Sequence, residues 1–192
     1  MKVLLACSHN SFMQWARHRC VGRLITPVLM QQELEHDYIA MDNFAFTGLD
    51  PVAFRQMLLA FSPSAESIKW VAVPDVVGDW AKTRRSFWGW SDRIRSLGYS
   101  LAYVLQDGQL PEEIPWSDIS AVFLGGTTEY KLSEDALTLC RKAKQFRGKM
   151  VHIGRVNSVL RISRFVGIAD SFDGMTFSRF PRTHLEQLTE IG

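Results

Sequence analysis

The sequence predicts a single α/β domain, built either as a doubly wound sheet or as a small (β/α) barrel. Two observations lead to this prediction: short apolar runs of strand-forming residues recur along the chain, and amphipathic helical patterns lie between them. The 192 residues suit one domain, and no break in composition divides them, so we expect one domain over 1–192. The segment ACSHNSF carries no Gly-rich phosphate loop, which makes a dinucleotide-binding sheet the less favoured alternative.

Seven short runs are predicted to be β-strands. Several are apolar almost throughout rather than alternating, as expected for parallel strands that are buried on both faces. In chain order the runs are KVLLACS, YIAMD, KWVAVPD, LAYVLQD, AVFLGG, MVHIG and IADSFD. The first is too short for a signal sequence or a membrane span, so no association with a membrane is expected.

Three helices are predicted between these runs. The first has Asp50 as N-cap and Pro51 at the first helical position. The second runs from about residue 80 to 97 and can be closed by Gly98, and the third begins after Ser133. Their predicted apolar faces are formed by Phe54, Met57, Leu58 and Phe61, by Trp80, Phe87, Trp90, Ile94 and Leu97, and by Ala136, Cys140 and Ala143.

Cysteine usage and charge bear on compartment and partners. Cys7, Cys20 and Cys140 are widely spaced and odd in number, so they predict neither a disulfide framework nor a zinc site and favour the cytoplasm. The net charge of +2 conceals an asymmetry: residues 1–140 hold 12 Lys/Arg and 16 Asp/Glu, whereas 141–192 hold 10 and 4. The basic part can face a polyanion such as nucleic acid, although the run RKAKQFRGK alone suits an ordinary solvated helix face.

Polar residues or glycines follow five of the predicted strands at the point where each ends. They are Asp42, Asp75, Gln106 with Asp107, Gly125 with Gly126, and Asp173. Any one such Asp is more often a turn residue or a helix N-cap than a catalyst. In a (β/α) barrel, however, the C-terminal strand ends meet at one mouth, where catalysis takes place. Their recurrence therefore predicts a shared site.

These residue types suit the chemistry of a guanine N-glycoside. A carboxylate can accept hydrogen bonds from N1–H and the exocyclic amine of guanine, while a glutamine and a glycine N–H donate to its carbonyl oxygen. Two further carboxylates suit glycosidic chemistry, one as nucleophile at the anomeric carbon and one in proton transfer. No metal-ligand cluster or cofactor motif accompanies them, so we expect neither a metal nor a cofactor.

The same motifs resemble those of the tRNA-guanine transglycosylase (queuine tRNA-ribosyltransferase) superfamily, and most closely its compact relatives linked to 7-deazaguanine modification of DNA. MDNFAF is similar to the segment that carries a catalytic Asp and a base-stacking aromatic residue, which would be Asp42 and Phe46. VPD and VLQDG place Asp75 and Gln106 at base-reading positions. FLGGTTE resembles the Gly-Gly turn whose backbone faces the base, here Gly125, Gly126 and Thr127.

Two C-terminal segments complete the resemblance, which runs in family order from about residue 22, in GRLITPVLM, to residue 181. VHIGRVNS places Ile153 where an apolar residue covers the second face of the base, and GIADSFDGMTFSR places Asp173 as nucleophile. The resemblance implies that Arg179 holds Asp173 or binds a phosphate. Arg155 and Asn157 are further candidate phosphate contacts, and His152 is either another or a core residue.

The resemblance implies a TIM-barrel-like fold, either complete or, in so short a chain, reduced. It also implies a base-exchange transglycosylase that replaces guanine in nucleic acid with a 7-deazaguanine. The family's zinc subdomain has no counterpart in this sequence, which favours DNA over tRNA as the substrate polymer. Two alternatives stay open: a hydrolase of deazaguanine N-glycosides, and a non-catalytic nucleic-acid-binding relative.

Overall fold

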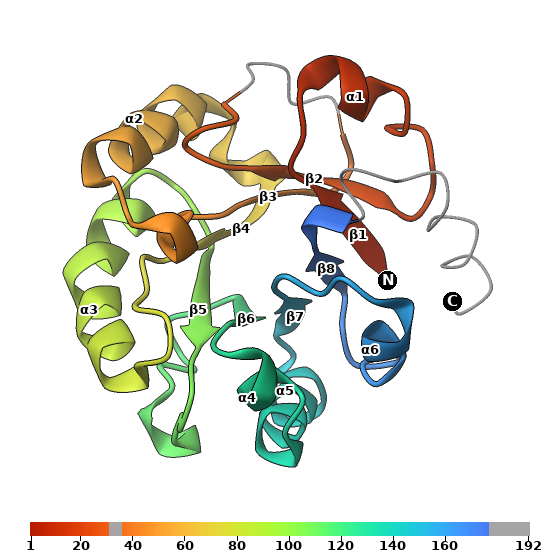
Figure 1. Cartoon of the computed structure of the whole chain (residues 1–192). Coiled ribbons are helices and arrows are strands. Elements are labelled where there is room, and N and C mark those ends of the chain that lie inside the picture. Colours follow the sequence, from red (N-terminus) through yellow and green to blue (C-terminus); the bar gives the residue numbers. More distant parts are fainter. Residues whose placement is uncertain (31–35, 177–192) are drawn as a thin grey trace.

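Eight parallel strands close into a barrel in chain order (Figure 1). The computed structural model describes residues 1–30 and 36–176. The strands are β1 (Lys2–Leu5), β2 (Val21–Ile25), β3 (Ile39–Met41), β4 (Ile68–Ala72), β5 (Leu101–Leu105), β6 (Ala121–Leu124), β7 (Met150–Ile153) and β8 (Ser171–Asp173). Each strand pairs in parallel with the next, and β8 pairs with β1 through Val3 and Phe172. The TIM-barrel-like fold is thus confirmed, and the barrel is complete rather than reduced.

One strand, β2, is not among the seven predicted runs; it overlaps the segment GRLITPVLM. Gly22 and the buried Arg23 interrupt its apolar pattern, so it does not stand out as a strand in the sequence. Gly22 has a packing reason, because a Cβ at this position would lie 2.5 Å from Leu4 Cδ2 and 3.0 Å from the Tyr38 carbonyl oxygen. The glycine therefore lets β2 fit between β1 and β3.

The helices surround the barrel (Figure 1). They are α1 (His9–Met13), α2 (Pro51–Phe61), α3 (Trp80–Ser96), α4 (Thr128–Lys131), α5 (Glu134–Arg147) and α6 (Val159–Ser163), with 3₁₀ turns η1 (Ala45–Thr47), η2 (Ser62–Ser67) and η3 (Pro111–Glu113). The three predicted helices are α2, α3 and α5, with Asp50 capping α2 and Ser133 capping α5 as expected. Gly98 follows α3 at φ 89°, a conformation that favours glycine.

The barrel fits into a short chain because several connections are brief. The link from β5 to β6 carries only the three-residue turn η3, and α1 and α6 have five residues each. The longest helices of the described residues are α2, α3 and α5.

The apolar core has two layers. The outer layer lies between the strands and the helices and contains, among others, Phe54, Phe87 and Ile153. The inner layer fills the barrel and combines two large side chains, the fully buried Trp70 and the buried Phe123, with small residues. The small members are Ala40, Ala72, Ala102 and Ala121. Since successive residues of a strand point to opposite sides, the inner layer fixes which side chains point into the barrel mouth.

Candidate active site at the barrel mouth

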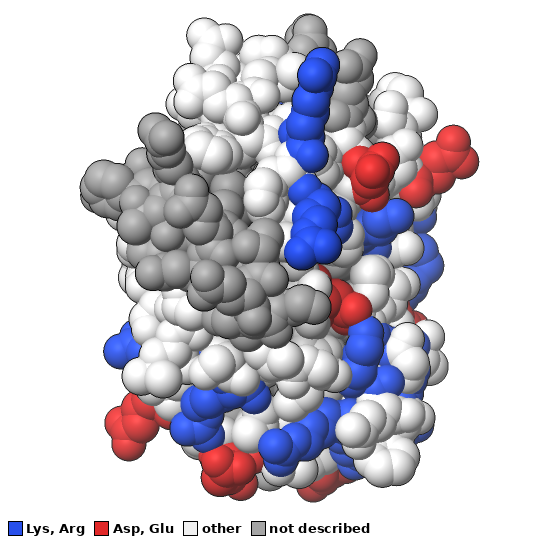
Figure 2. All heavy atoms as spheres, turned by 90° about the vertical axis from the view of Figure 1, so that its right-hand side faces the viewer, with Lys and Arg blue, Asp and Glu red and all other residues white. Residues whose placement is uncertain are grey.

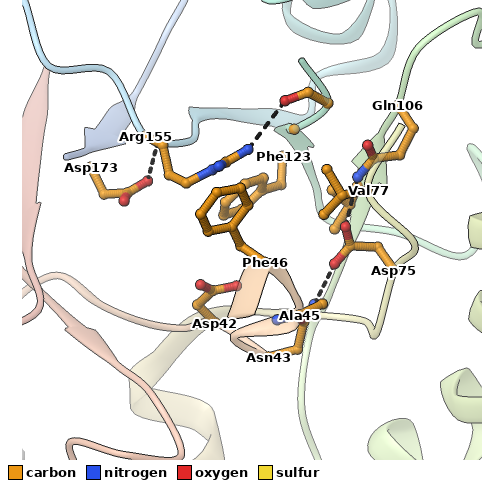
Figure 3. A pocket seen from close by; sticks show the side chains of 13 residues that line it. Asp42, Asn43, Ala45, Phe46, Asp75, Val77, Gln106, Phe123, Arg155 and Asp173 are labelled. Carbon is orange, nitrogen blue, oxygen red and sulfur yellow. Dashed lines mark hydrogen bonds between the residues drawn. The ribbon is translucent and has the colours of Figure 1, made fainter. Parts of the chain in front are cut away.

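The C-terminal ends of β3 to β8 surround a small cavity (Figure 3). It is lined by eight of the predicted site residues, namely Asp42, Phe46, Asp75, Gln106, Gly125, Gly126, Arg155 and Asp173. Three of them extend the inner layer: Asp42 comes two residues after Ala40, Gln106 two after Val104, and Asp173 two after the buried Ser171. The two-residue period of a strand therefore points these side chains into the mouth.

Asp75 is held by two side-chain amides. Asn43 Nδ2 donates to Asp75 Oδ1 at 2.9 Å, and Gln106 Nε2 donates to Oδ2 at 2.6 Å. Gln106 Oε1 in turn accepts from the backbone N–H of Gly78 at 2.8 Å. Burial raises the pKa of Asp75, and the amide of Asn43 partly opposes this rise. Sequence reasoning missed Asn43, whose only signal was its place directly after Asp42.

Asp173 is oriented by two donors that both reach Oδ1. His152 Nε2 lies 3.0 Å from this oxygen, and the backbone N–H of Arg155 donates to it at 2.9 Å. Among residues 1–30 and 36–176, no donor to Oδ2 is found. Oδ1 is thus the oxygen that His152 and the Arg155 backbone hold in place.

His152 belongs to this site and not to a phosphate-binding surface. It is completely buried inside the barrel, with ring centroids 4.8 Å from Trp70 and 4.6 Å from Phe123. Its Nδ1 lies 2.9 Å from Ser171 Oγ, which is 3.2 Å from the Tyr38 hydroxyl. Because a carboxylate only accepts, Nε2 carries the proton in the bond to Asp173. A continuous hydrogen-bonded chain therefore supports Asp173 from below.

Asp42 has the chemistry of a proton carrier. It is half-buried, and burial raises its pKa to about 7, helped by the negative charges of Asp173 and Asp75. A carboxyl group with a pKa near neutrality can both give and take a proton at neutral pH. In the view of Figure 3, Asp42 and Asp173 lie on one side of Phe46, and Asp75 and Gln106 lie on the other.

Arg155 covers the exposed ring of Phe46. Its guanidinium carbon lies 3.5 Å from the ring centroid, and Nη2 donates to the Gly126 carbonyl at 3.2 Å. Arg155 and Phe44 have φ values of 53° and 63°, the only positive values among the described residues other than glycine. Backbone conformations of this kind cost free energy and concentrate at functional sites.

Two residues that were predicted to contact the base, Ile153 and Thr127, do not line the cavity. Ile153 is 1% exposed and packs in the outer layer, so it does not cover a base. The Thr127 backbone N–H donates to Asp107 Oδ2 at 2.9 Å and does not line the cavity, because the loop turns it towards the preceding strand end. Arg179 lies outside the described residues.

Close packing requires glycine at positions 125 and 126, whatever their role in binding. The Gly125 N–H donates to the Leu105 carbonyl, and a Cβ on Gly125 would lie 2.9 Å from Gln106 Nε2. Gly126 has φ 76°, and a Cβ there would clash with the carboxylate of Asp107. Both glycines let β6 end close to Gln106 and Asp107.

Two further properties concern the described residues alone. Within 1–30 and 36–176, no three His, Cys, Asp or Glu side chains are grouped so that they could hold a metal ion. In the same part of the chain, no helix has the length and apolar character needed to cross a membrane.

Comparisons with known proteins add a likeness in fold. No family model and no curated protein matches the chain. Similar solved structures include tryptophan synthase from M. tuberculosis, with 12% identity, a TM-score of 0.47, and 81% of this chain and 78% of that chain covered. An HpcH/HpaI aldolase from Desulfitobacterium hafniense DCB-2 has 10% identity and a TM-score of 0.48, with 98% and 91% covered. Neither likeness bears on activity.

Proposed function

We propose that the protein is an enzyme, a base-exchange transglycosylase that replaces guanine in nucleic acid, DNA rather than tRNA, with a 7-deazaguanine derivative. One observation carries the proposal: three carboxyl groups with different environments line the same cavity. Asp173 is held at one oxygen, Asp42 has a pKa of about 7, and Asp75 is held by two amides. These are the nucleophile, the proton carrier and the base reader that such an exchange requires.

In the first half-reaction, Asp173 Oδ2 attacks the anomeric carbon of the target nucleotide. The new C–O bond forms as the glycosidic C–N bond breaks, and the electron pair of that bond leaves with guanine. The protonated carboxyl of Asp42 supplies the proton that the departing base takes up. His152 and the Arg155 N–H hold Oδ1, so that Oδ2 faces the sugar.

In the second half-reaction, a 7-deazaguanine occupies the cavity that guanine has left. The Asp42 carboxylate accepts the proton from the ring nitrogen of the incoming base as this nitrogen attacks the anomeric carbon. The C–O bond to Asp173 then breaks, and its carboxylate is regenerated. Two inversions at the same carbon give overall retention of configuration.

Base recognition would fall to Asp75, Gln106 and Phe46. The Asp75 carboxylate has lone pairs left to accept from N1–H and the exocyclic amine, and the second N–H of Gln106 can donate to the carbonyl oxygen. Since Arg155 already covers one face of Phe46, a base stacks on the other face or displaces the guanidinium. With Ile153 facing outward, the apolar lining of the cavity besides Phe46 consists of Ala45, Val77, Val104 and Phe123.

The test is incorporation of label from a radiolabelled 7-deazaguanine into guanine-containing DNA or tRNA. We expect label in DNA with the native protein and none with Asp173→Asn, whereas Asp92→Asn, which changes an 88% exposed side chain, leaves incorporation intact. Label in tRNA alone would show that the polymer is wrong. Release of free base without incorporation would favour the hydrolase, and neither result in any polymer would refute the proposal.

A further inference from the structure

A second and larger cavity, of about 440 Å³, opens beside the first. Both cavities are bordered by Asp42, Phe46, Arg155 and Asp173. The additional wall of the larger cavity is supplied in part by Lys131 on α4 and Arg161 on α6. A ligand that reaches Asp173 from the base cavity can therefore extend into this second space.

The positive charges in this wall have neutral partners. Lys131 is only 6% exposed, and its Nζ donates to the Gly154 carbonyl at 2.9 Å. Arg155 donates to a carbonyl and lies on an aromatic ring. Among residues 1–30 and 36–176, none of Lys131, Arg155 and Arg161 forms an ion pair with a carboxylate.

Neighbouring cations outside the cavity do have acidic partners. Arg164, three residues after Arg161 on the same side of the barrel, donates to Glu134 Oε1 at 2.7 Å. Lys144 forms an ion pair with Asp170. Arg164 thus provides an ion-paired counterpart to Arg161, which has no such partner among the described residues.

Asp173 attracts both Lys131 and Arg155 electrostatically, but it forms no ion pair with either of them. Burial lowers the pKa of Lys131 to about 8, and the charge of Arg155 adds to this effect. Thr26 also borders the cavity, and its buried Oγ1 has no hydrogen-bond partner among the described residues. A polar anion in the cavity would offset the repulsion and offer a partner to such groups.

We propose that Lys131, Arg155 and Arg161 form a phosphate subsite, so that the ligand is a nucleotide or a nucleic acid strand rather than a free nucleoside. The identity of the ligand as a nucleotide rests on the proposed function, whereas the anion subsite rests on the cavity wall alone. Because Asp173 borders both cavities, the sugar would sit at the junction, with its base in the smaller cavity and its phosphate in the larger. Figure 2 shows Lys and Arg side chains in several groups on the side of the molecule that carries α6, as suits a polymer with further phosphates.

The test compares four ligands by calorimetric titration: deoxyguanosine, dGMP, deoxyadenosine and dAMP. For the native protein we expect each nucleotide to bind about tenfold or more tightly than its nucleoside, as charge-assisted contacts to phosphate allow. Arg161→Gln should reduce this preference about tenfold. Arg164→Gln removes the same charge from a residue that is paired with Glu134, and should leave the preference unchanged.

The two comparisons separate the two proposals. A preference for the nucleotide over the nucleoside reports the phosphate subsite. A preference for the guanine ligand over the adenine ligand reports the base cavity of the proposed function. Equal binding of nucleotide and nucleoside, or no binding of any of the four at millimolar concentration, would overturn the subsite. Lys131→Met should abolish the phosphate preference if it keeps the native melting temperature. If Lys131→Met does not fold, Arg161→Gln still tests the subsite, because Arg161 is exposed. An unchanged preference in Arg161→Gln would also count against the subsite.

Discussion

Replacing Asp42 by Asn should make the protein more stable at neutral and alkaline pH. The pKa of Asp42 rises from 3.8 to about 7 on folding. A raised folded-state pKa stabilises the protein below the unfolded value, and this contribution is lost as the pH rises through about 7. At about 1.36 kcal/mol per pKa unit, the full loss amounts to about 4 kcal/mol. Water that reaches the half-buried carboxyl reduces it to about 2 kcal/mol.

Asn keeps the shape of Asp42 and an oxygen that can accept from the backbone N–H groups of Asn43 and Phe44, but it never ionises. The assay is urea unfolding of the native protein and Asp42→Asn between pH 5 and pH 8. We expect the variant's gain to be larger at pH 8 than at pH 5 by about 1 kcal/mol, because the part of the loss that falls between the unfolded pKa of 3.8 and pH 5 is already present at pH 5. Asp92→Asn serves as the control, since the Asp92 side chain is 88% exposed and a surface ion pair contributes little to stability. A gain that is constant with pH, or a loss at pH 8, would refute the assignment of Asp42 as proton carrier.

Three further predictions follow from the site. His152→Ala should lower the rate of glycosyl-enzyme formation about 100-fold without weakening base binding, and His152→Gln, which can still donate to Asp173, should restore part of the rate in single-turnover kinetics. Ile153→Ala should lower the free energy of unfolding by about 2–4 kcal/mol with base affinity unchanged, whereas Phe46→Ala should weaken base binding about tenfold with little loss of stability. The phosphate preference should fall as the pH rises through about 8 in the native protein and stay flat in Lys131→Met, because Lys131 loses its charge there. The charged groups that face Lys131 are Arg155, Asp173, Arg161 and Asp107.

The strand-end residues could be found in the sequence because the evidence for them is local. Each apolar run marks a strand, and the residue that follows marks the edge of the sheet at which that strand ends. Asp42, Gln106 and Asp173 were placed in one mouth on this basis, and the structure brings all three to the same cavity. Asn43 was missed because nothing in its neighbourhood shows that its amide reaches Asp75, which is 32 positions away in the chain.

The side of the barrel to which each residue of β7 points could not be derived from the sequence. A strand that is buried on both faces gives no alternation to show which residues face inward, and a shift by one residue exchanges the two sets. The packing decides in favour of His152, because both ring nitrogens find partners only inside the barrel, on Ser171 and Asp173. An inward Ile153 would instead place the imidazole among the apolar side chains of the outer layer, at the cost of burying unpaired polar atoms.

Arg155 connects the two halves of the proposed site. Its backbone N–H holds Asp173 Oδ1, while its side chain covers Phe46 and borders the larger cavity. The left-handed backbone at φ 53° is what allows both, and for a residue with a Cβ it costs roughly 1–2 kcal/mol. A glycine could give the same N–H contact without this cost. The strained arginine is therefore best explained by its guanidinium, whose positive charge lies where the base, the sugar and the phosphate of a nucleotide would meet.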